Sequence, residues 1–253
     1  MFIQITAAAA PAASANPYGL WESLEQGGVI SWAVFIILCI FSVGSFFILF
    51  SKLIEQQKVI SQAKKVNQTF WRAGSLKEGS AKLEKNSAYK QLVDDGIAAQ
   101  EHHSKLTDPV EAHDWLHSSL NRSEAAINSK LNGGLAFLAT VGATAPFIGL
   151  FGTVIGIYRA LIKIGSSGQA SIDTVAGPVG EALIMTALGL VVAVPAVLAY
   201  NWLQRRNKGI AEDLSGFNND LLGYMVSNGA VRPTVVAAAP AAKPVAAPAG
   251  AKA

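Results

Sequence analysis

Residues 131–158 read LNGGLAFLATVGATAPFIGLFGTVIGIY, which is 28 consecutive positions without a charged side chain. Two other stretches are similar: Gln26–Ser51 has no charge over 26 residues, and Thr174–Gln204 has one, Glu181, over 31. A helix needs about 20 apolar residues to cross roughly 30 Å of hydrocarbon, so each stretch is long enough to span a membrane. The sequence therefore predicts an all-α integral membrane protein with three transmembrane helices.

The composition argues against several other classes of protein. Apolar residues make up 51% of the chain and charged residues 15%, whereas about 25% is usual for charged residues in soluble domains. The single cysteine, Cys39, excludes a disulfide scaffold. A net charge of +3 gives no reason to expect nucleic acid as a partner.

The chain also lacks the sequence patterns of common catalytic and cofactor sites. His113 and His117 have the i, i+4 spacing of a helical metal pair, but no HExxH pattern or cysteine cluster accompanies them. No GxxxxGK[ST] loop is present to bind ATP. We therefore expect surface histidines, no cofactor, no metal and no enzymatic activity.

Positive charges indicate the orientation of the chain, because short loops rich in lysine and arginine stay in the cytoplasm. No lysine or arginine precedes Lys52, whereas residues 52–130 carry twelve, and three more follow between positions 205 and 208. This asymmetry predicts a periplasmic N-terminus and a cytoplasmic C-terminus. The lack of early basic residues also argues against a cleaved signal peptide.

These observations divide the chain into eight predicted parts. They are a periplasmic Ala/Pro-rich extension with a short interfacial helix (1–28), the first transmembrane helix (29–50), a cytoplasmic helical domain (51–133), the second transmembrane helix (134–158), a periplasmic loop (159–176), the third transmembrane helix (177–203), a cytoplasmic helical extension (204–228) and a disordered Ala/Pro/Lys tail (229–253). The short interfacial helix at 18–26 and an unstructured leader explain the first part about equally well.

The charged segment after the first span is predicted to be helical, with long helices continuing out of the bilayer as a cytoplasmic bundle. Gly74 and Ser75 interrupt the helical pattern that begins at Leu53. The sequence Thr107-Asp108-Pro109 is typical of a helix start with proline in its first turn.

Small residues recur along one face of the second span. Their positions, at intervals of three and four, are Gly142, Ala145, Gly149, Gly152 and Gly156. In lipid, close backbone packing must drive helix association, and small residues permit it. Packing between spans two and three explains this stripe well. Because span three is small on several faces, we also expect contacts with neighbouring subunits.

Prolines lie inside two of the spans. Pro146 in span two and Pro195 in span three each remove one backbone hydrogen bond and can kink their helix. Such kinks are compatible with a moving bundle, although ordinary membrane helices tolerate proline as well.

Polar residues inside the membrane supply the functional candidates. Glu181 is the one charged residue of the third span, and a carboxylate inside a membrane indicates a functional site. A structural interpretation is equally good from the pattern alone, because Gly177-Pro178 is typical of a helix start and an acid in the first turns favours the helix dipole. Threonines in the spans usually bond back to their own helix.

The residues of spans two and three resemble those of a known family. Leu138–Ile157 (LATVGATAPFIGLFGTVIGI), together with Gly177–Leu190 (GPVGEALIMTALGL), resembles the ExbB/TolQ/MotA family of ion-driven motor subunits. The run GLFGTV and Trp71 are similar to the ExbB branch. The resemblance covers about residues 30 to 227, outside the Ala/Pro-rich ends.

This resemblance implies a homopentamer around a central pore in the inner membrane of Gram-negative bacteria. The pore would hold the single transmembrane helices of ExbD-like subunits, and TonB would transmit the work to outer-membrane receptors for iron–siderophores and vitamin B12. The family's pore glutamate falls on Glu181, and its pore threonines fall on Thr153 and Thr186. With this resemblance, a functional role for Glu181 becomes the favoured interpretation.

Three other functions are compatible with parts of the sequence. A TolQ-type stator of the Tol-Pal system shares most of the motifs. A structural membrane scaffold would need the small residues but not Glu181. A self-sufficient ion channel ranks lowest, because a single acid near the membrane edge offers poor selectivity.

Overall fold

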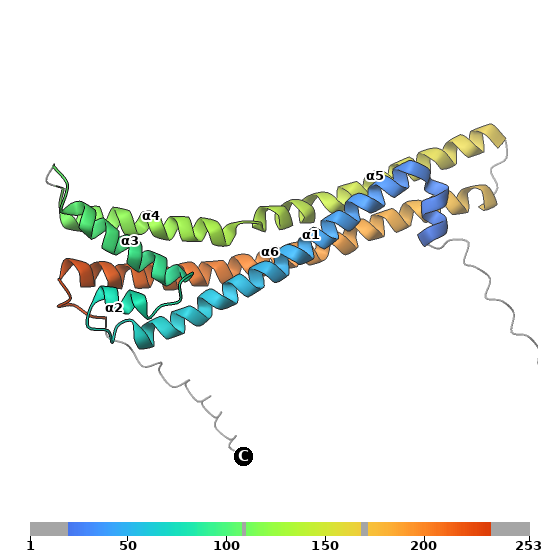
Figure 1. Cartoon of the computed structure of the whole chain (residues 1–253). Helices are drawn as coiled ribbons and strands as arrows, with labels where there is room; N and C mark the ends of the chain where they lie inside the picture. Colours follow the sequence, from blue (N-terminus) through green and yellow to red (C-terminus); the bar gives the residue numbers. More distant parts are fainter. Residues whose placement is uncertain (1–19, 108–109, 168–171, 234–253) are drawn as a thin grey trace, which may run out of the picture. The chain divides into compact units, whose positions relative to one another are not determined.

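The computed structural model describes residues 20–107, 110–167 and 172–233, and these residues form helices and no strand (Figure 1). The helices are α1 (Leu20–Thr69), α2 (Leu76–Ala81), α3 (Ala88–His103), α4 (Ala112–Asn132), α5 (Leu135–Ser167) and α6 (Ile172–Val226). Three of the helical stretches are long and apolar enough to cross a membrane. The predicted all-α membrane fold with three spans is confirmed.

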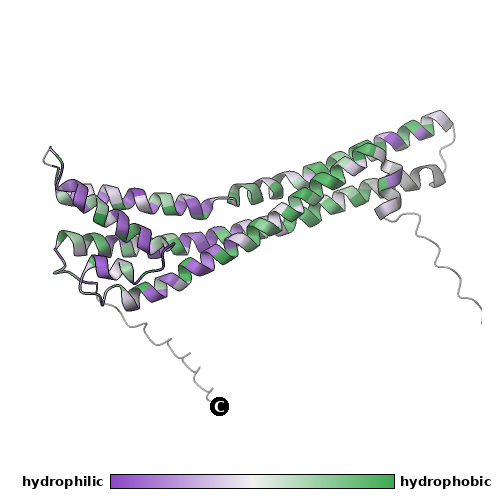
Figure 2. Cartoon of the chain, viewed as in Figure 1, coloured by the Kyte–Doolittle hydropathy of each residue, from purple (hydrophilic) through white to green (hydrophobic). Residues whose placement is uncertain are grey.

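The chain divides into two compact units. The membrane unit comprises the residues up to Ile54 together with Asn132–Arg206, and the polar unit comprises Glu55–Leu131 together with the residues from Asn207 onward. α1 and α6 contribute to both units. In Figure 2, hydrophobic residues dominate the helices of the membrane unit, and hydrophilic residues are frequent on α2, α3 and α4. Residues 1–19 of the predicted extension (1–28) and residues 234–253 of the predicted tail (229–253) lie outside the described residues.

The membrane unit consists of three helical segments packed around a core of aliphatic and small side chains. Its buried members are Leu24, Val34, Leu38, Val141, Ala145, Met185, Ala193 and Ala196. Many large apolar side chains on the outer faces of the same helices are exposed, among them Val43, Phe47 and Leu198. Such exposure is unfavourable in water and is expected where lipid or another apolar surface covers the helices.

α1 begins with a short segment that ends at a break in helical geometry. Gly28 has φ 61° and ψ −155°, a left-handed conformation that glycine adopts without steric cost. Leu24, in the segment before this break, is fully buried in the core of the membrane unit. A short helix ahead of the first span is therefore present, and its location at the membrane interface stays a prediction.

The polar unit is held together by an aromatic cluster. Phe70 and Trp71 follow α1, and both rings contact Phe217 of α6 at centroid distances of 5.5 and 5.6 Å. Tyr89 of α3 meets the same ring edge-on at 5.2 Å. Burial raises the pKa of the Tyr89 phenol, with a smaller contribution from Asp213. Trp71, which carries part of the family resemblance, is thus a core residue here.

The helix boundaries explain the predicted break at Gly74 and Ser75. Ser75 is the N-cap of α2, and its side chain accepts a hydrogen bond from the Glu78 backbone N–H at 3.3 Å. The Glu78 carboxylate accepts in turn from the Gly74 N–H at 3.1 Å. This reciprocal pair satisfies two backbone donors at the helix start.

The structure differs from the sequence-based boundaries around residues 159–176. α5 continues to Ser167, and α6 is already helical from Ile172. Polar residues such as Arg159 end an apolar pattern without ending a helix, because backbone hydrogen bonds are local. Gly177-Pro178 also lies inside α6 and is not its first turn.

Candidate functional site: the contact between α5 and α6

α5 and α6 approach most closely where glycine faces glycine. A Cβ added to Gly149 would lie 2.6 Å from the Met185 carbonyl oxygen and 3.2 Å from the Cα of Gly189. A Cβ on Gly189 would lie 2.7 Å from the Ala145 carbonyl oxygen. Real Cβ atoms do not occupy such positions, so the two backbones touch only because both residues are glycine.

The remaining small residues of the stripe continue this contact. A Cβ on Gly142 would overlap the side chain of Val197, and one on Gly152 would lie 2.9 Å from the Met185 Cβ. All five members of the stripe, Gly142, Ala145, Gly149, Gly152 and Gly156, are buried. Gly142, Gly149 and Gly152 therefore have their close contacts within the chain, and the role of the whole stripe stays a prediction. Contacts with neighbouring subunits also stay a prediction.

The pairing along this contact defines an antiparallel register. Gly142 faces Val197, Gly149 faces Gly189 and Thr186, and Gly152 faces Met185. Continuing one turn further brings the backbone of Glu181 level with Gly156. At 1.5 Å per residue, the backbones of Glu181 and Thr186 are separated by about 7.5 Å along the axis of α6.

Thr153 lies in this same region of α5. Its side chain is 8% exposed, and its hydroxyl donates to the Leu150 carbonyl at 2.6 Å. Thr140 and Thr144 likewise donate to carbonyls four residues earlier, both at 2.8 Å. These bonds match the expectation that membrane threonines bond back to their own helix. The Thr153 oxygen retains acceptor capacity.

The two other predicted pathway residues lie on α6. Thr186 is half-buried, and its Cα would be 3.2 Å from a Cβ on Gly149. Glu181 is part of α6, but its side chain lies outside the described side chains. The structure thus brings Thr153 and Thr186 to one stretch of the α5–α6 contact, and the backbone register puts Glu181 within about two turns of both.

The two prolines lie inside continuous helices. α5 runs through Pro146 and α6 runs through Pro195. Pro195 borders a narrow space shared with Ser42 and Ser45 of α1. A kink at either proline stays a prediction.

One interaction at an end of the membrane unit could not be predicted from the sequence. Arg159 of α5 donates a hydrogen bond from Nη1 to the backbone carbonyl of Gly27. Gly27 precedes the break in α1, where the last carbonyls of the short helical segment have no partner within the helix. The pair Gly27-Gly28 before an apolar run is compatible with a break in the helix. Nothing in the sequence links this break to Arg159, which lies 132 positions after Gly27.

Comparison with known proteins identifies the family. The sequence profile of the MotA/TolQ/ExbB proton channel family matches residues 84–215, more than half of the chain and all of the α5–α6 contact. The chain belongs to this family. The MotA/TolQ/ExbB match therefore covers Thr153, Glu181 and Thr186, but not α1 of the membrane unit.

Individual MotA/TolQ/ExbB relatives extend the similarity over most of the chain. The chain is 38% identical over 213 residues to the biopolymer transport protein ExbB of Xanthomonas campestris pv. campestris strain B100, covering 80% of this chain and 84% of that protein. It is 53% identical over 118 residues to the ExbB of Neisseria gonorrhoeae, covering 47% and 54% of the two chains. The Tol-Pal system protein TolQ of Haemophilus influenzae is 30% identical over 207 residues, covering 76% and 87%. The ExbB relatives are the more similar, so the predicted assignment to the ExbB branch is confirmed.

Proposed function

We propose that this protein is the stator subunit of an energy transducer that, with an ExbD-like partner, couples the proton motive force of the bacterial inner membrane to TonB-dependent import through outer-membrane receptors. One observation carries the proposal. A proton channel family member has one carboxylate, Glu181, within the apolar stretch 174–204 of a helix that is packed backbone to backbone against its neighbour. The names of the ExbB relatives support biopolymer transport as the process that is energised.

Glu181 is the group that takes up and releases the proton, and Thr153 and Thr186 provide hydroxyls along the same stretch. A charge that crosses the membrane potential releases about 2.3 kcal/mol per 100 mV. Coupling this free energy to motion requires a titratable group on a proton pathway from which bulk water is largely excluded. Glu181 alone, as the one acid of the third span, is too few to carry protons across the membrane. The partner must therefore supply a second carboxylate.

The partner helices would occupy the centre of a ring of identical subunits, a pentamer by analogy with the family. Exposed apolar faces on all three spans leave surface both for neighbouring subunits and for membrane lipids. The charge asymmetry supports an N-terminus in the periplasm and a C-terminus in the cytoplasm.

Replacement of the acid tests the proposal. In cells that lack the native gene, Glu181→Ala should abolish proton-driven iron–siderophore uptake, while the variant still co-purifies with its partner. Glu212→Ala, an exposed acid on α6 in the polar unit, is the matched control and should support normal uptake. Normal uptake by Glu181→Ala would refute the proton-carrying role and would favour a purely structural scaffold.

A TolQ-type stator of the Tol-Pal system is the second candidate, because a TolQ protein is 30% identical over most of the chain. The two candidates differ in the phenotype of a deletion strain. Loss of siderophore uptake supports the proposal, whereas a defect in outer-membrane constriction with normal uptake would support the Tol-Pal alternative.

A further inference from the structure

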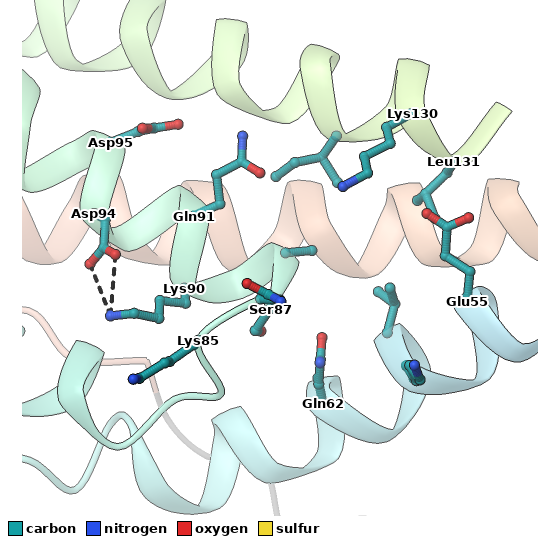
Figure 3. A pocket seen from close by; sticks show the side chains of 15 residues that line it. Glu55, Gln62, Lys85, Ser87, Lys90, Gln91, Asp94, Asp95, Lys130 and Leu131 are labelled. Atoms are coloured by element: carbon teal, nitrogen blue, oxygen red, sulfur yellow. Dashed lines mark hydrogen bonds and ion pairs between the residues drawn. The ribbon is translucent and has the colours of Figure 1, made fainter. Parts of the chain in front are cut away.

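The polar unit contains a cavity of about 650 Å³ between α1, α3 and α4 (Figure 3). α1 contributes Lys58 and Gln62, the start of α3 contributes Ser87, and the segment before it contributes Lys85. This volume lies in the range of small-molecule sites, which is roughly 300–1,000 Å³. We call this cavity the α3 pocket. It is separate from the α5–α6 contact, since its lining residues belong to the polar unit.

The first observation concerns the N-terminus of α3. Ser87 is the N-cap residue of this 16-residue helix, but its side chain makes no capping hydrogen bond. Ser87 is 3% exposed, and its Oγ is buried without a hydrogen-bond partner among the described residues. The first N–H groups of a helix also have no partner within it and attract anions. The first turn of α3 carries no acidic residue that would serve instead.

The second observation is independent, because it comes from α1. Gln62 is 8% exposed and lines the α3 pocket, into which its side chain rises from α1 in Figure 3. Its Nε2 donates to the Glu84 carboxylate at 3.0 Å. A carboxylate can only accept, so this bond fixes the amide orientation and leaves Oε1 as the free atom. Oε1 is buried and has no donor among the described residues. A buried acceptor of this kind needs a donor from elsewhere.

The charges around the pocket favour an anion. Lys90 is paired with Asp94 at 3.2 Å, and Asp95 accepts from the Ser123 hydroxyl at 2.5 Å. Glu55 and Lys130 on the rim have interactions of their own. Lys58 and Lys85 make no ion pair with any described residue, and Lys58 acts on Glu84 only at longer range. Asp95 is likewise in no described ion pair, so four lysines and three carboxylates line the pocket and leave an excess of one positive charge for a ligand.

The geometry points to a ligand that is a phosphate ester with a free hydroxyl group. A tetrahedral phosphate has enough acceptor atoms for the α3 N-terminus, the Ser87 hydroxyl and a lysine together. The ligand's hydroxyl would donate to Gln62 Oε1. The same chemistry occurs in a soluble phosphorylated polyol and in the headgroup of phosphatidylglycerol.

Binding is tested with the full chain purified in dodecyl maltoside at low ionic strength, because salt screens exposed lysines. The soluble probe is sn-glycerol 3-phosphate, titrated by isothermal calorimetry, with inorganic phosphate as the probe that lacks a fixed hydroxyl arm. The lipid probe is phosphatidylglycerol in phosphatidylcholine nanodiscs, with bound lipid counted by native mass spectrometry. Phosphatidylcholine carries the phosphate but no free hydroxyl, so it serves as the background.

The variants separate the pocket from general charge effects. Lys85→Gln removes an exposed charge, and Gln62→Leu removes the buried acceptor. Each should weaken binding about tenfold or more, because the ligand's phosphate loses a hydrogen bond to a charged group or its hydroxyl is left without an acceptor. Lys77→Gln makes the same charge change at an exposed lysine that is paired with Glu101 and lies outside the pocket. It should bind as the unmodified chain does. Far-UV circular dichroism confirms that each variant is folded, and Lys85→Gln keeps the test decisive if Gln62→Leu does not fold.

Each outcome decides the matter. Saturable binding of glycerol 3-phosphate that is lost in Lys85→Gln supports the inference with a soluble ligand. Selective retention of phosphatidylglycerol, lost in the same variant and displaced by glycerol 3-phosphate, supports it with a lipid ligand. Binding that is absent for both probes, or that is equal in Lys85→Gln and Lys77→Gln, overturns it.

Discussion

The guanidinium of Arg159 holds the backbone carbonyl of Gly27, 132 residues earlier in the chain. Arg159 lies near the C-terminal end of α5, and Gly27 is the last residue before α1 leaves helical geometry at Gly28. Cationic side chains stabilise the carbonyl end of a helix both by hydrogen bonding and through the helix dipole. This bond and the buried Leu24 therefore fix the short first segment of α1 against the rest of the membrane unit.

Replacing the arginine should release that segment. Arg159→Ala removes a hydrogen bond from a charged donor, which stabilises the segment by about 1.5–3 kcal/mol. A tenfold change in the opening equilibrium of the segment corresponds to about 1.4 kcal/mol. We expect amide hydrogens of residues 21–27 to exchange about tenfold faster or more. Hydrogen–deuterium exchange with mass spectrometry on the detergent-solubilised protein measures this change.

Lys163→Ala is the control for this measurement, because Lys163 is an exposed basic residue one turn further along α5. Its exchange pattern in residues 21–27 should match that of the unmodified chain. Equal exchange in Arg159→Ala and Lys163→Ala would show that Leu24 alone holds the segment.

The glycine contact between α5 and α6 predicts a second result. Gly149→Ala would place a Cβ 2.6 Å from the Met185 carbonyl oxygen, so the helices must separate. Overpacking of this kind costs about 1–3 kcal/mol, and we expect a lower thermal unfolding midpoint in detergent. The matched control is Gly165→Ala on the same helix, where no described atom lies within 4 Å of the added Cβ.

Gly165→Ala should leave the midpoint unchanged or raise it, because alanine is favoured over glycine in a helix by about 0.8–1.0 kcal/mol. If Gly149→Ala were as stable as Gly165→Ala, the close approach of the two backbones would not exist in the membrane protein.

The parts of this fold that follow from local chemistry could be predicted from the sequence. The charge-free stretch around Gly149 and the stretch 174–204, whose one charge is Glu181, identify spans, because hydrocarbon excludes most charges over a fixed length. The break at Gly74 and Ser75 was predictable because these residue types interrupt a helical pattern, whereas the role of Ser75 as the N-cap of α2 appears only in the structure. The stripe of small residues predicts close packing, but small residues allow any helix to approach. Only the structure shows that the partner is α6 of the same chain.

The parts that depend on distant contacts could not be predicted. Gln62, Glu84 and Ser87 each have the appearance of ordinary solvated polar residues in the sequence. In the folded chain α1 packs near the start of α3, which buries Gln62 and Ser87 and brings Gln62 within hydrogen-bond distance of Glu84. Arg159 similarly acts on Gly27 through the tertiary fold. Polar residues after position 158 likewise give no sign in the sequence that α5 continues to Ser167.

A buried polar contact in the polar unit predicts a third result. Asn207 of α6 accepts from Gln56 Nε2 of α1 at 2.7 Å and donates to the Leu131 carbonyl at the end of α4 at 3.1 Å. Asn207→Ala removes both bonds and should lower the free energy of unfolding by about 1–3 kcal/mol, because a buried donor and acceptor lose their partner. Chemical denaturation followed by circular dichroism measures this loss.

Asn219→Ala, at an exposed position on α6, should change stability by less than about 0.5 kcal/mol. A double-mutant cycle with Gln56→Ala isolates the Gln56–Asn207 bond from the loss of packing. Additive effects of the two substitutions would mean that the bond contributes nothing to stability.

The pH dependence of Glu84 gives a fourth prediction. Hydrogen bonds from Lys65, at 2.9 Å, and from Gln62 hold the pKa of the Glu84 carboxyl below its ordinary value of 4.5. A group whose pKa is lowered on folding contributes stability above its unfolded pKa, and that contribution is lost as the pH falls from 4.5 through the folded value. Lys65→Met should raise the Glu84 pKa towards 4.5, and carbon-13 NMR of the carboxyl group measures it directly.

Lys64→Met is the matched control, because Lys64 is the exposed neighbouring lysine and does not act on Glu84. Its Glu84 pKa should equal that of the unmodified chain. Gln62→Leu should also raise the pKa, by less than Lys65→Met, since the lysine bond is the larger cause. Identical pKa values in Gln62→Leu and the unmodified chain would mean that Glu84 does not fix the Gln62 amide. The assignment of Oε1 as the atom facing the α3 pocket would then lose its basis.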